Sequence, residues 1–173
     1  MESLTYIGNF VIENGIIISD PCYKFKEKYD IQAHFNDNDV MKGNWKTFSD
    51  KDEYAELICI HESISKSEEN WNFIDKQVAV DSGQMGVFDT KHFKDDNIVG
   101  NTKLWNMIPI IKPGDKWYSM CCAKSTDMEN NNFSGVIPFG AVSKAGYGDG
   151  LYSFATIKKD GKICGIRIVF IEK

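Results

Sequence analysis

Residues 11–23 read VIENGIIISDPCY, two apolar runs that are separated by a Glu-Asn-Gly turn and closed by Asp20-Pro21. Asn-Gly between apolar segments is a strong signal for a β-hairpin, because both residues tolerate the positive φ of a tight turn. Proline lacks an N–H group and disfavours helix in the preceding residue, so the second run ends as a strand. The stretch therefore predicts a β-rich chain that opens with a hairpin of Tyr6–Ile12 and Gly15–Ser19.

Short strands and tight turns continue along the chain. The turns Asp81-Ser82-Gly83-Gln84 and Lys159-Asp160-Gly161 each separate two apolar runs, which predicts two further hairpins. The stretch Lys116–Ser125 favours a helix over a strand. We expect one mainly β domain over residues 1–173, a β-rich α+β chain that forms a single antiparallel sandwich or partly open barrel with one or two short helices. Further strands are expected at Val40–Ser49, Tyr54–His61, Gln77–Val80, Met85–Phe88, Tyr152–Lys158 and Lys162–Ile171.

Two stretches interrupt the β pattern. Lys24–Asn38 carries scattered aromatic and charged residues and is consistent with a short helix or a mobile loop. Residues 90–116 are polar and contain Pro109 and Pro113. Loops of this length in compact domains are often functional or disordered.

Composition limits the class of protein. The net charge of −5 gives no electrostatic reason to expect duplex nucleic acid or an anionic membrane as a partner. The longest apolar stretches, such as Ile163–Ile171, are too short to span a bilayer, and no signal peptide is visible. The five cysteines form no CxxC pair, so we expect reduced thiols in a cytoplasmic protein without a structural metal or a cofactor.

Polar, turn-forming and nucleophilic residues follow four of the predicted strands. Rigid strands can present such residues to a ligand from the loops at their ends. If the four strand ends share one side of the domain, they supply one cleft with Asp20, Cys22, His61, Asp81, Ser82, Gln84, Tyr147, Asp149 and Tyr152.

Each element also has a purely structural interpretation. Asp20 can cap the turn before Pro21 by accepting hydrogen bonds from local N–H groups. Cys22 can be a small buried hydrophobic residue, and His61 a core histidine that is bonded to the backbone. The three glycines of residues 146–150 (GYGDG) permit a positive φ, and they suit a bulge or a turn as well as an anion-binding nest.

The order of these segments resembles an uncharacterised group of bacterial and phage proteins. The shared signatures are (S/T)DPCY, VDSGQ-x-G-x-FD and GYGDG-x-Y, which here read SDPCY, VDSGQMGVFD and GYGDGLY. The resemblance covers nearly the whole chain, with a departure in residues 90–116. It implies a shared small β-rich fold, and it implicates Asp20, Cys22, Asp81, Gln84, Asp89, Gly148, Asp149 and Tyr152.

Binding of a small polar molecule is the function that these residues favour. Aromatic rings would line a cleft while amide and glycine N–H groups orient the ligand, an arrangement that suits a nucleotide-like molecule. The candidate ligand-binding residues are Asp81, Ser82, Gln84, Tyr147, Gly148, Asp149, Tyr152 and Tyr23. The phage resemblance suggests that such a protein sequesters its ligand during phage–host conflict.

Three other functions remain open from the sequence. A cysteine-dependent hydrolase or transferase would use Cys22 as nucleophile, His61 as base and Asp20 or Asp81 as the orienting acid. A protein-interaction or immunity-type module would need no pocket, and a homo-oligomer is compatible with the sequence. Metal binding by Asp20, Asp81, Asp89 and Asp149 lacks the spacing of a known loop and is the least supported alternative.

Overall fold

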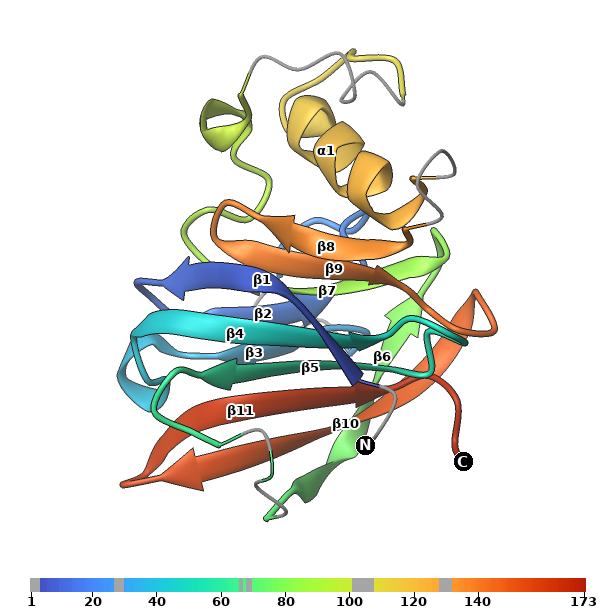
Figure 1. Ribbon diagram of the computed structural model, residues 1–173. Helices are drawn as coiled ribbons and strands as arrows, with labels where there is room; N and C mark the ends of the chain where they lie inside the picture. Colours follow the sequence, from blue (N-terminus) through green and yellow to red (C-terminus); the bar gives the residue numbers. More distant parts are fainter. Residues whose placement is uncertain (1–3, 27–29, 66, 68–69, 101–107, 128–131) are drawn as a thin grey trace.

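The computed structural model describes residues 4–26, 30–65, 67, 70–100, 108–127 and 132–173. Within these residues the chain forms an antiparallel β sandwich with one short α-helix, as the sequence predicts (Figure 1). A six-stranded sheet has the order β1-β4-β5-β11-β10-β6, and a five-stranded sheet has the order β3-β2-β7-β9-β8. The elements are β1 Leu4–Ile12, β2 Ile16–Ser19, β3 Ala33–Phe35, β4 Gly43–Asp50, β5 Glu56–His61, β6 Asn72–Val80, β7 Gln84–Asp89, α1 Asp115–Ser125, β8 Ser134–Ile137, β9 Gly140–Lys144, β10 Gly150–Lys159 and β11 Lys162–Val169.

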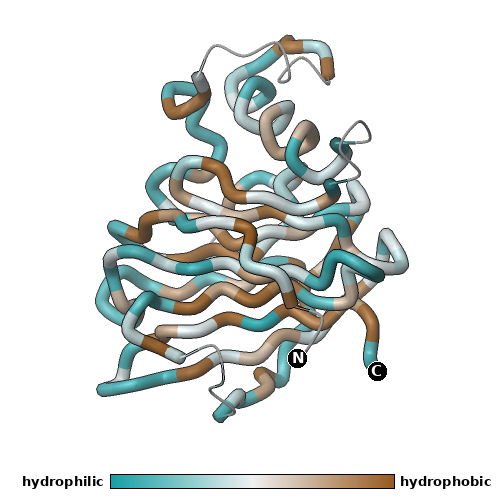
Figure 2. Tube along the Cα trace, viewed as in Figure 1, coloured by the Kyte–Doolittle hydropathy of each residue, from teal (hydrophilic) through white to brown (hydrophobic). Residues whose placement is uncertain are grey.

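Strand β2, an interior strand of the five-stranded sheet, is buried on both faces. Ile16 and Ile18 belong to the core between the sheets, whereas Ile17 belongs to a second cluster beneath α1. Side chains of a strand alternate between its two faces, so a strand that is covered on both sides needs an unbroken apolar run. Hydrophobic stretches run along the strands, and hydrophilic stretches lie at many of the turns (Figure 2).

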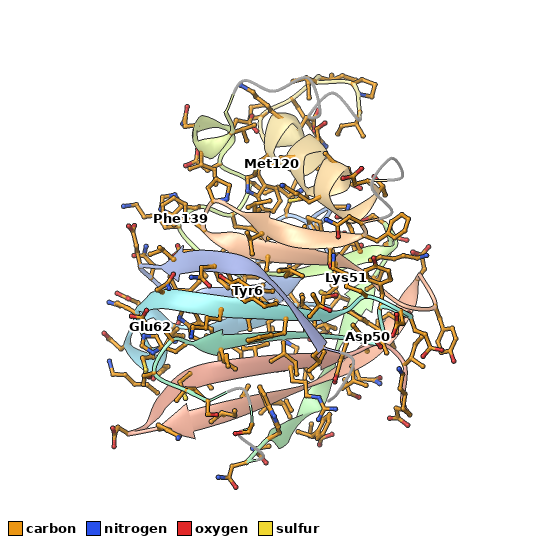
Figure 3. The ribbon with its side chains drawn as sticks, in the orientation of Figure 1. Tyr6, Asp50, Lys51, Glu62, Met120 and Phe139 are labelled. Atoms are coloured by element: carbon orange, nitrogen blue, oxygen red, sulfur yellow. The ribbon has the colours of Figure 1, made fainter. Side chains whose placement is uncertain are left out.

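Helix α1 covers the outer face of the five-stranded sheet, next to β8 and β9 (Figure 1). Its Trp117 ring packs edge-on against Phe88 of β7, with ring centroids 5.0 Å apart. Met120, labelled on α1 in Figure 3, is buried in the same cluster. The helix that the sequence predicts at Lys116–Ser125 is confirmed, one residue longer at its start.

Two of the three predicted hairpins are corners between the sheets. The Asn14-Gly15 turn joins β1 to β2, but β1 pairs with β4, whereas β2 pairs with β3 and β7. The Asp81–Gly83 turn likewise leads from β6 in one sheet to β7 in the other. Both sequence signals correctly predict a turn at these positions. The predicted pairing of the two flanking strands with each other is wrong, because a tight turn can also join strands of two different sheets.

The third predicted hairpin is confirmed. Strands β10 and β11 pair up to Lys159 and Lys162, and the two residues between them have positive φ, 54° at Asp160 and 75° at Gly161. Two residues with positive φ are typical of the turn that matches the right-handed twist of a hairpin.

The two irregular stretches contain short regular elements. Residues 24–38 hold β3 and the beginning of a 3₁₀ turn at Asp37–Asp39, and residues 90–116 hold a 3₁₀ turn at Asp96–Ile98 as well as the beginning of α1. Residues 27–29 and 101–107 of these stretches lie outside the described residues.

A buried carboxylate at the end of β7 holds the β1–β2 corner. Asp89 Oδ2 accepts hydrogen bonds from the N–H groups of Glu13, at 2.6 Å, and Asn14, at 2.9 Å, and its Oδ1 accepts one from the N–H of Lys91 at 2.9 Å. Gly15, which follows Asn14 in this corner, has no room for a side chain, because a Cβ there would lie 2.2 Å from the carbonyl oxygen of Phe35. Charge-assisted hydrogen bonds of this kind compensate the burial of the carboxylate.

We expect Asp89→Asn to lower the free energy of unfolding by roughly 2–4 kcal/mol, because an amide NH₂ would then face backbone N–H donors. Urea denaturation followed by fluorescence measures this change. Asp52→Asn, at an exposed position, is the matched control and should change the free energy by less than about 0.5 kcal/mol. Equal effects of the two substitutions would contradict the role of Asp89.

Candidate functional site

Polar residues follow four of the strands, and we call these four segments the strand exits. Three of them, after β2, β6 and β9, meet at one end of the sandwich. Strands β2 and β9 are both antiparallel to β7, so both end where β7 begins, and β7 begins directly after the exit of β6. The N–H of Ala145 donates to the carbonyl of Gly83 at 3.0 Å, and the N–H of Gly83 donates to Asp149 Oδ1 at 3.0 Å. The GYGDG loop and the 81–84 turn are therefore neighbours, as the sequence predicts.

The fourth exit lies at the opposite end. Three antiparallel pairings connect β5 to β6 through β11 and β10, so β5 and β6 run in opposite directions. Figure 3 shows Glu62, which follows β5, on the side of the sandwich opposite to Asp50. The ring nitrogens of His61 face Ser63 Oγ, at 2.7 Å, and the carbonyl oxygen of Lys42, at 2.9 Å. The expectation that His61 shares a cleft with Cys22 is wrong, because the topology separates the two exits.

Asp20 is a buried connector rather than the orienting acid of a catalytic group. Its Oδ1 accepts from the Cys22 N–H at 2.8 Å and from Ser82 Oγ at 2.6 Å. Its Oδ2 accepts from the N–H groups of Asp81, at 2.8 Å, and Ser82, at 2.6 Å. Four hydrogen bonds occupy the carboxylate, which ties the end of β2 to the β6–β7 corner.

Two predicted ligand-binding side chains are engaged within the protein. Gln84 is 3% exposed and faces α1, where its Nε2 donates to Cys122 Sγ at 3.3 Å and its Oε1 accepts from Ser125 Oγ at 2.8 Å. The buried Tyr152 hydroxyl donates to the carbonyl of Gly148 at 2.5 Å. Gln84 therefore fastens the helix, and Tyr152 braces the GYGDG loop, while Tyr147 on that loop is 79% exposed.

A cavity of about 610 Å³ lies beside the β2 exit, between Cys22 and the start of α1. Its apolar walls come from Phe25, Phe93, Ile108, Pro113 and the ring of Tyr118.

Three lysines, Lys24, Lys94 and Lys112, also line this cavity, with Asp115 as the acidic residue among the described lining residues. Lys24 and Lys112 are exposed, whereas Lys94 is partly buried. The sequence did not point to Lys94 or Tyr118 as site residues. The one signal near Lys94 was the long polar stretch of residues 90–116, since loops of this length are often functional. Of the predicted site residues, Cys22 is part of the lining.

Lys94 occupies an unusual position in the cavity wall. Its Nζ donates a hydrogen bond to the carbonyl oxygen of Pro21 and lies 5.4 Å and 5.0 Å from the ring centroids of Trp117 and Tyr118. Burial lowers the pKa of the Lys94 amine, because desolvation disfavours its charged form. Its backbone is left-handed, with a φ of 65°, which is uncommon for a residue with a side chain.

The Cys22 thiol is half-buried and is kept protonated. Burial, and then the neighbouring Asp20 charge, raise the pKa of the thiol from 9.0 to about 12. A cysteine nucleophile requires the opposite shift, since the thiolate is the reactive form. The raised pKa and the distant His61 both argue against a cysteine-dependent reaction. The expected reduced, partly buried state of Cys22 agrees with its free, half-buried thiol.

Tyr118 connects the cavity to the predicted turn. The Tyr118 hydroxyl lies near the side chains of Ser82 and Cys122, and burial raises the pKa of Tyr118. Ser82 in turn donates to Asp20. The Ser82 side chain therefore reaches the cavity wall through Tyr118, although the GYGDG loop supplies none of the described lining residues.

The first turn of α1 is already capped by a carboxylate. Asp96 accepts from the N–H of Gly114 at 2.9 Å and from the N–H of Trp117 at 2.8 Å. These helix N–H groups are thus not free for a ligand, so the positive character of the cavity comes from its lysines. Within the described part of the chain, no three His, Cys, Asp or Glu side chains are grouped to hold a metal ion.

No family model, curated protein or solved structure matches this chain. The resemblance to bacterial and phage proteins stays a prediction. No helix among the described residues has the length and apolar character needed to span a membrane.

We expect Cys22 to react with iodoacetamide at least about a hundredfold more slowly in the native protein than in urea, because its pKa of about 12 leaves little thiolate. Mass spectrometry of the Cys22 peptide over time measures the rate at pH 8. Rapid and complete alkylation in the native state would contradict the protonated, half-buried thiol.

Proposed function

We propose that the protein binds a small anionic molecule that carries a planar ring, and that it binds this molecule in the cavity between Cys22 and α1. The observation that supports this proposal is the combination of three lysines with aromatic and aliphatic walls around a volume of about 610 Å³. Cavities of roughly 300–1,000 Å³ with apolar walls and a few placed polar groups are typical of small-ligand sites.

The local charge of the cavity is opposite to that of the whole chain. The chain has a net charge of −5, whereas the cavity is lined by three lysines and Asp115. The Asp115 carboxylate is already engaged, because its Oδ2 accepts from the N–H groups of Ile111 and Lys112, each at 2.9 Å. An anionic group on a ligand would therefore be attracted to Lys112 and Lys24 at the exposed side of the cavity.

The apolar walls favour a ring on the same ligand. Phe25, Phe93 and Tyr118 offer aromatic surfaces, and base or ring stacking on such surfaces contributes about 1–3 kcal/mol per ring. A nucleotide-like molecule has both required parts, a planar base and a phosphate. Sequestration of such a molecule in phage–host conflict is the biological role that accords with the family resemblance.

A second hollow on the protein is less suited to an anionic ligand than the cavity beside Cys22. It has a volume of about 430 Å³ and is lined in part by Glu56, Arg167 and Lys173. Its two basic side chains are already paired, since Arg167 Nε lies 2.7 Å from Glu56 Oε2 and Lys173 Nζ lies 3.1 Å from Asp50 Oδ2. A ligand there would first have to break ion pairs.

We expect 8-anilinonaphthalene-1-sulfonate, an aromatic anion, to bind with one molecule per chain and to lose about tenfold in affinity in the double variant Lys24→Gln/Lys112→Gln. Fluorescence titration measures both values. Lys91→Gln, which removes an exposed lysine outside the cavity, should leave the affinity unchanged. Equal weakening in both variants, or none in either, would refute the assignment of the cavity.

Competition then tests the nucleotide-like character of the ligand. The common nucleoside monophosphates should displace the fluorescent anion, and the matching uncharged nucleosides should displace it at least about tenfold less well, because they lack the phosphate. If nucleosides and nucleotides compete equally, the charged contact with the lysines is wrong.

A further inference from the structure

We propose that Lys94 captures a carbonyl group of the bound molecule, so that a small aldehyde or ketone with an acidic group is held in the cavity as an imine. This inference rests on the proposed binding function and extends it from a non-covalent to a reversible covalent contact. Four features of Lys94 support it: the position of its amine, its backbone conformation, its protonation and the chemistry of the product.

The amine of Lys94 lies inside the cavity wall at a fixed position. Its Nζ is anchored to the carbonyl of Pro21, the residue before Cys22, and it lies 5.0–5.8 Å from the centroids of three aromatic rings. Its side chain packs along Gly114, where an added Cβ would lie 3.5 Å from Lys94 Cδ. A nucleophile that is held in place avoids much of the entropic cost of meeting its partner.

The backbone of Lys94 is held in a strained conformation. A φ of 65° is uncommon for a residue with a side chain, and such conformations are found most often at functional sites. The left-handed conformation lies directly after Phe93, which is buried beneath α1. The turn thus packs Phe93 into the cluster beneath α1, and both Phe93 and Lys94 line the cavity.

Burial also favours the reactive form of the amine. Only a neutral amine attacks a carbonyl, and desolvation lowers the pKa of Lys94, while Cys121, Cys22 and Asp20 act in the opposite direction and Lys112 adds to the lowering. The neighbouring thiol does not compete, because the Cys22 pKa of about 12 keeps it protonated.

The product fits the surroundings of the amine. The neutral amine adds to the carbonyl carbon, a C–N bond forms, and the carbonyl oxygen leaves as water with the two amine protons, so no oxidant or reductant is needed. Protonation of the imine gives an iminium with one N–H. That N–H can keep donating to the Pro21 carbonyl, and its charge would lie beside the rings of Trp117 and Tyr118.

The test uses 4-carboxybenzaldehyde, which combines a ring, an acid and an aldehyde, with sodium cyanoborohydride to reduce any imine to a stable amine. Peptide mapping by mass spectrometry should find the carboxybenzyl group on Lys94 at least about tenfold faster than on Lys91, an exposed lysine of the same segment. The corresponding alcohol, 4-(hydroxymethyl)benzoate, should bind without reacting and should protect Lys94.

The variants and the alcohol separate the two proposals. Lys94→Arg keeps the positive charge but cannot form an imine, so it should bind the alcohol and lose the fast labelling. If the alcohol binds and labelling of Lys94 in the unaltered protein is no faster than that of Lys91, imine formation is refuted and the binding site stands. If neither the alcohol nor the fluorescent anion binds, both proposals fail. Labelling of the unaltered protein decides the result even if the variant does not fold.

Discussion

Two buried carboxylates, Asp20 and Asp89, hold the corners at which the chain passes from one sheet to the other. They lie at opposite ends of the antiparallel pair β2 and β7, and their roles are reciprocal. Asp20 follows β2 and binds the turn that leads into β7, whereas Asp89 ends β7 and binds the turn that leads into β2. The sandwich needs these bonds because corner N–H groups have no partner in either sheet and would be costly to bury unpaired.

The same bonds build the candidate site. Asp20 fixes the N–H of Cys22 and thereby the side of the cavity that Cys22 lines. On the other side, Asp96 fixes the first turn of α1 at Gly114 and Trp117. Lys94 joins these two sides, since its stem packs near Gly114 and its amine is bonded to Pro21. The position of the lysine amine therefore depends on two carboxylates that never contact a ligand in the proposed site.

The candidate site was predictable from the sequence only in part. The polar strand exits pointed to Asp20, Cys22 and Ser82, which lie together at one end of the sandwich. His61 follows a strand with a similar pattern, but its direction in the sheet depends on three pairings that local sequence does not encode. Lys94 and Tyr118 carry no local motif, because their importance arises when residues 92–94 and α1 pack on the outer face of β7.

The sequence by itself determined the β class, the positions of the turns and the short helix. Those features follow from local physics: Gly permits the positive φ of the turns at Gly83 and Gly161, Pro ends a strand, and unbroken apolar runs demand burial on both faces. Only the tertiary structure decided whether a turn makes a hairpin or a corner, and which exits share an end. The Asn14-Gly15 and Asp160-Gly161 turns carry similar local signals, yet one joins two sheets and the other two neighbours in one sheet. The difference lies in Asp89, which is 75 residues from Asn14 along the chain and contacts it only after folding.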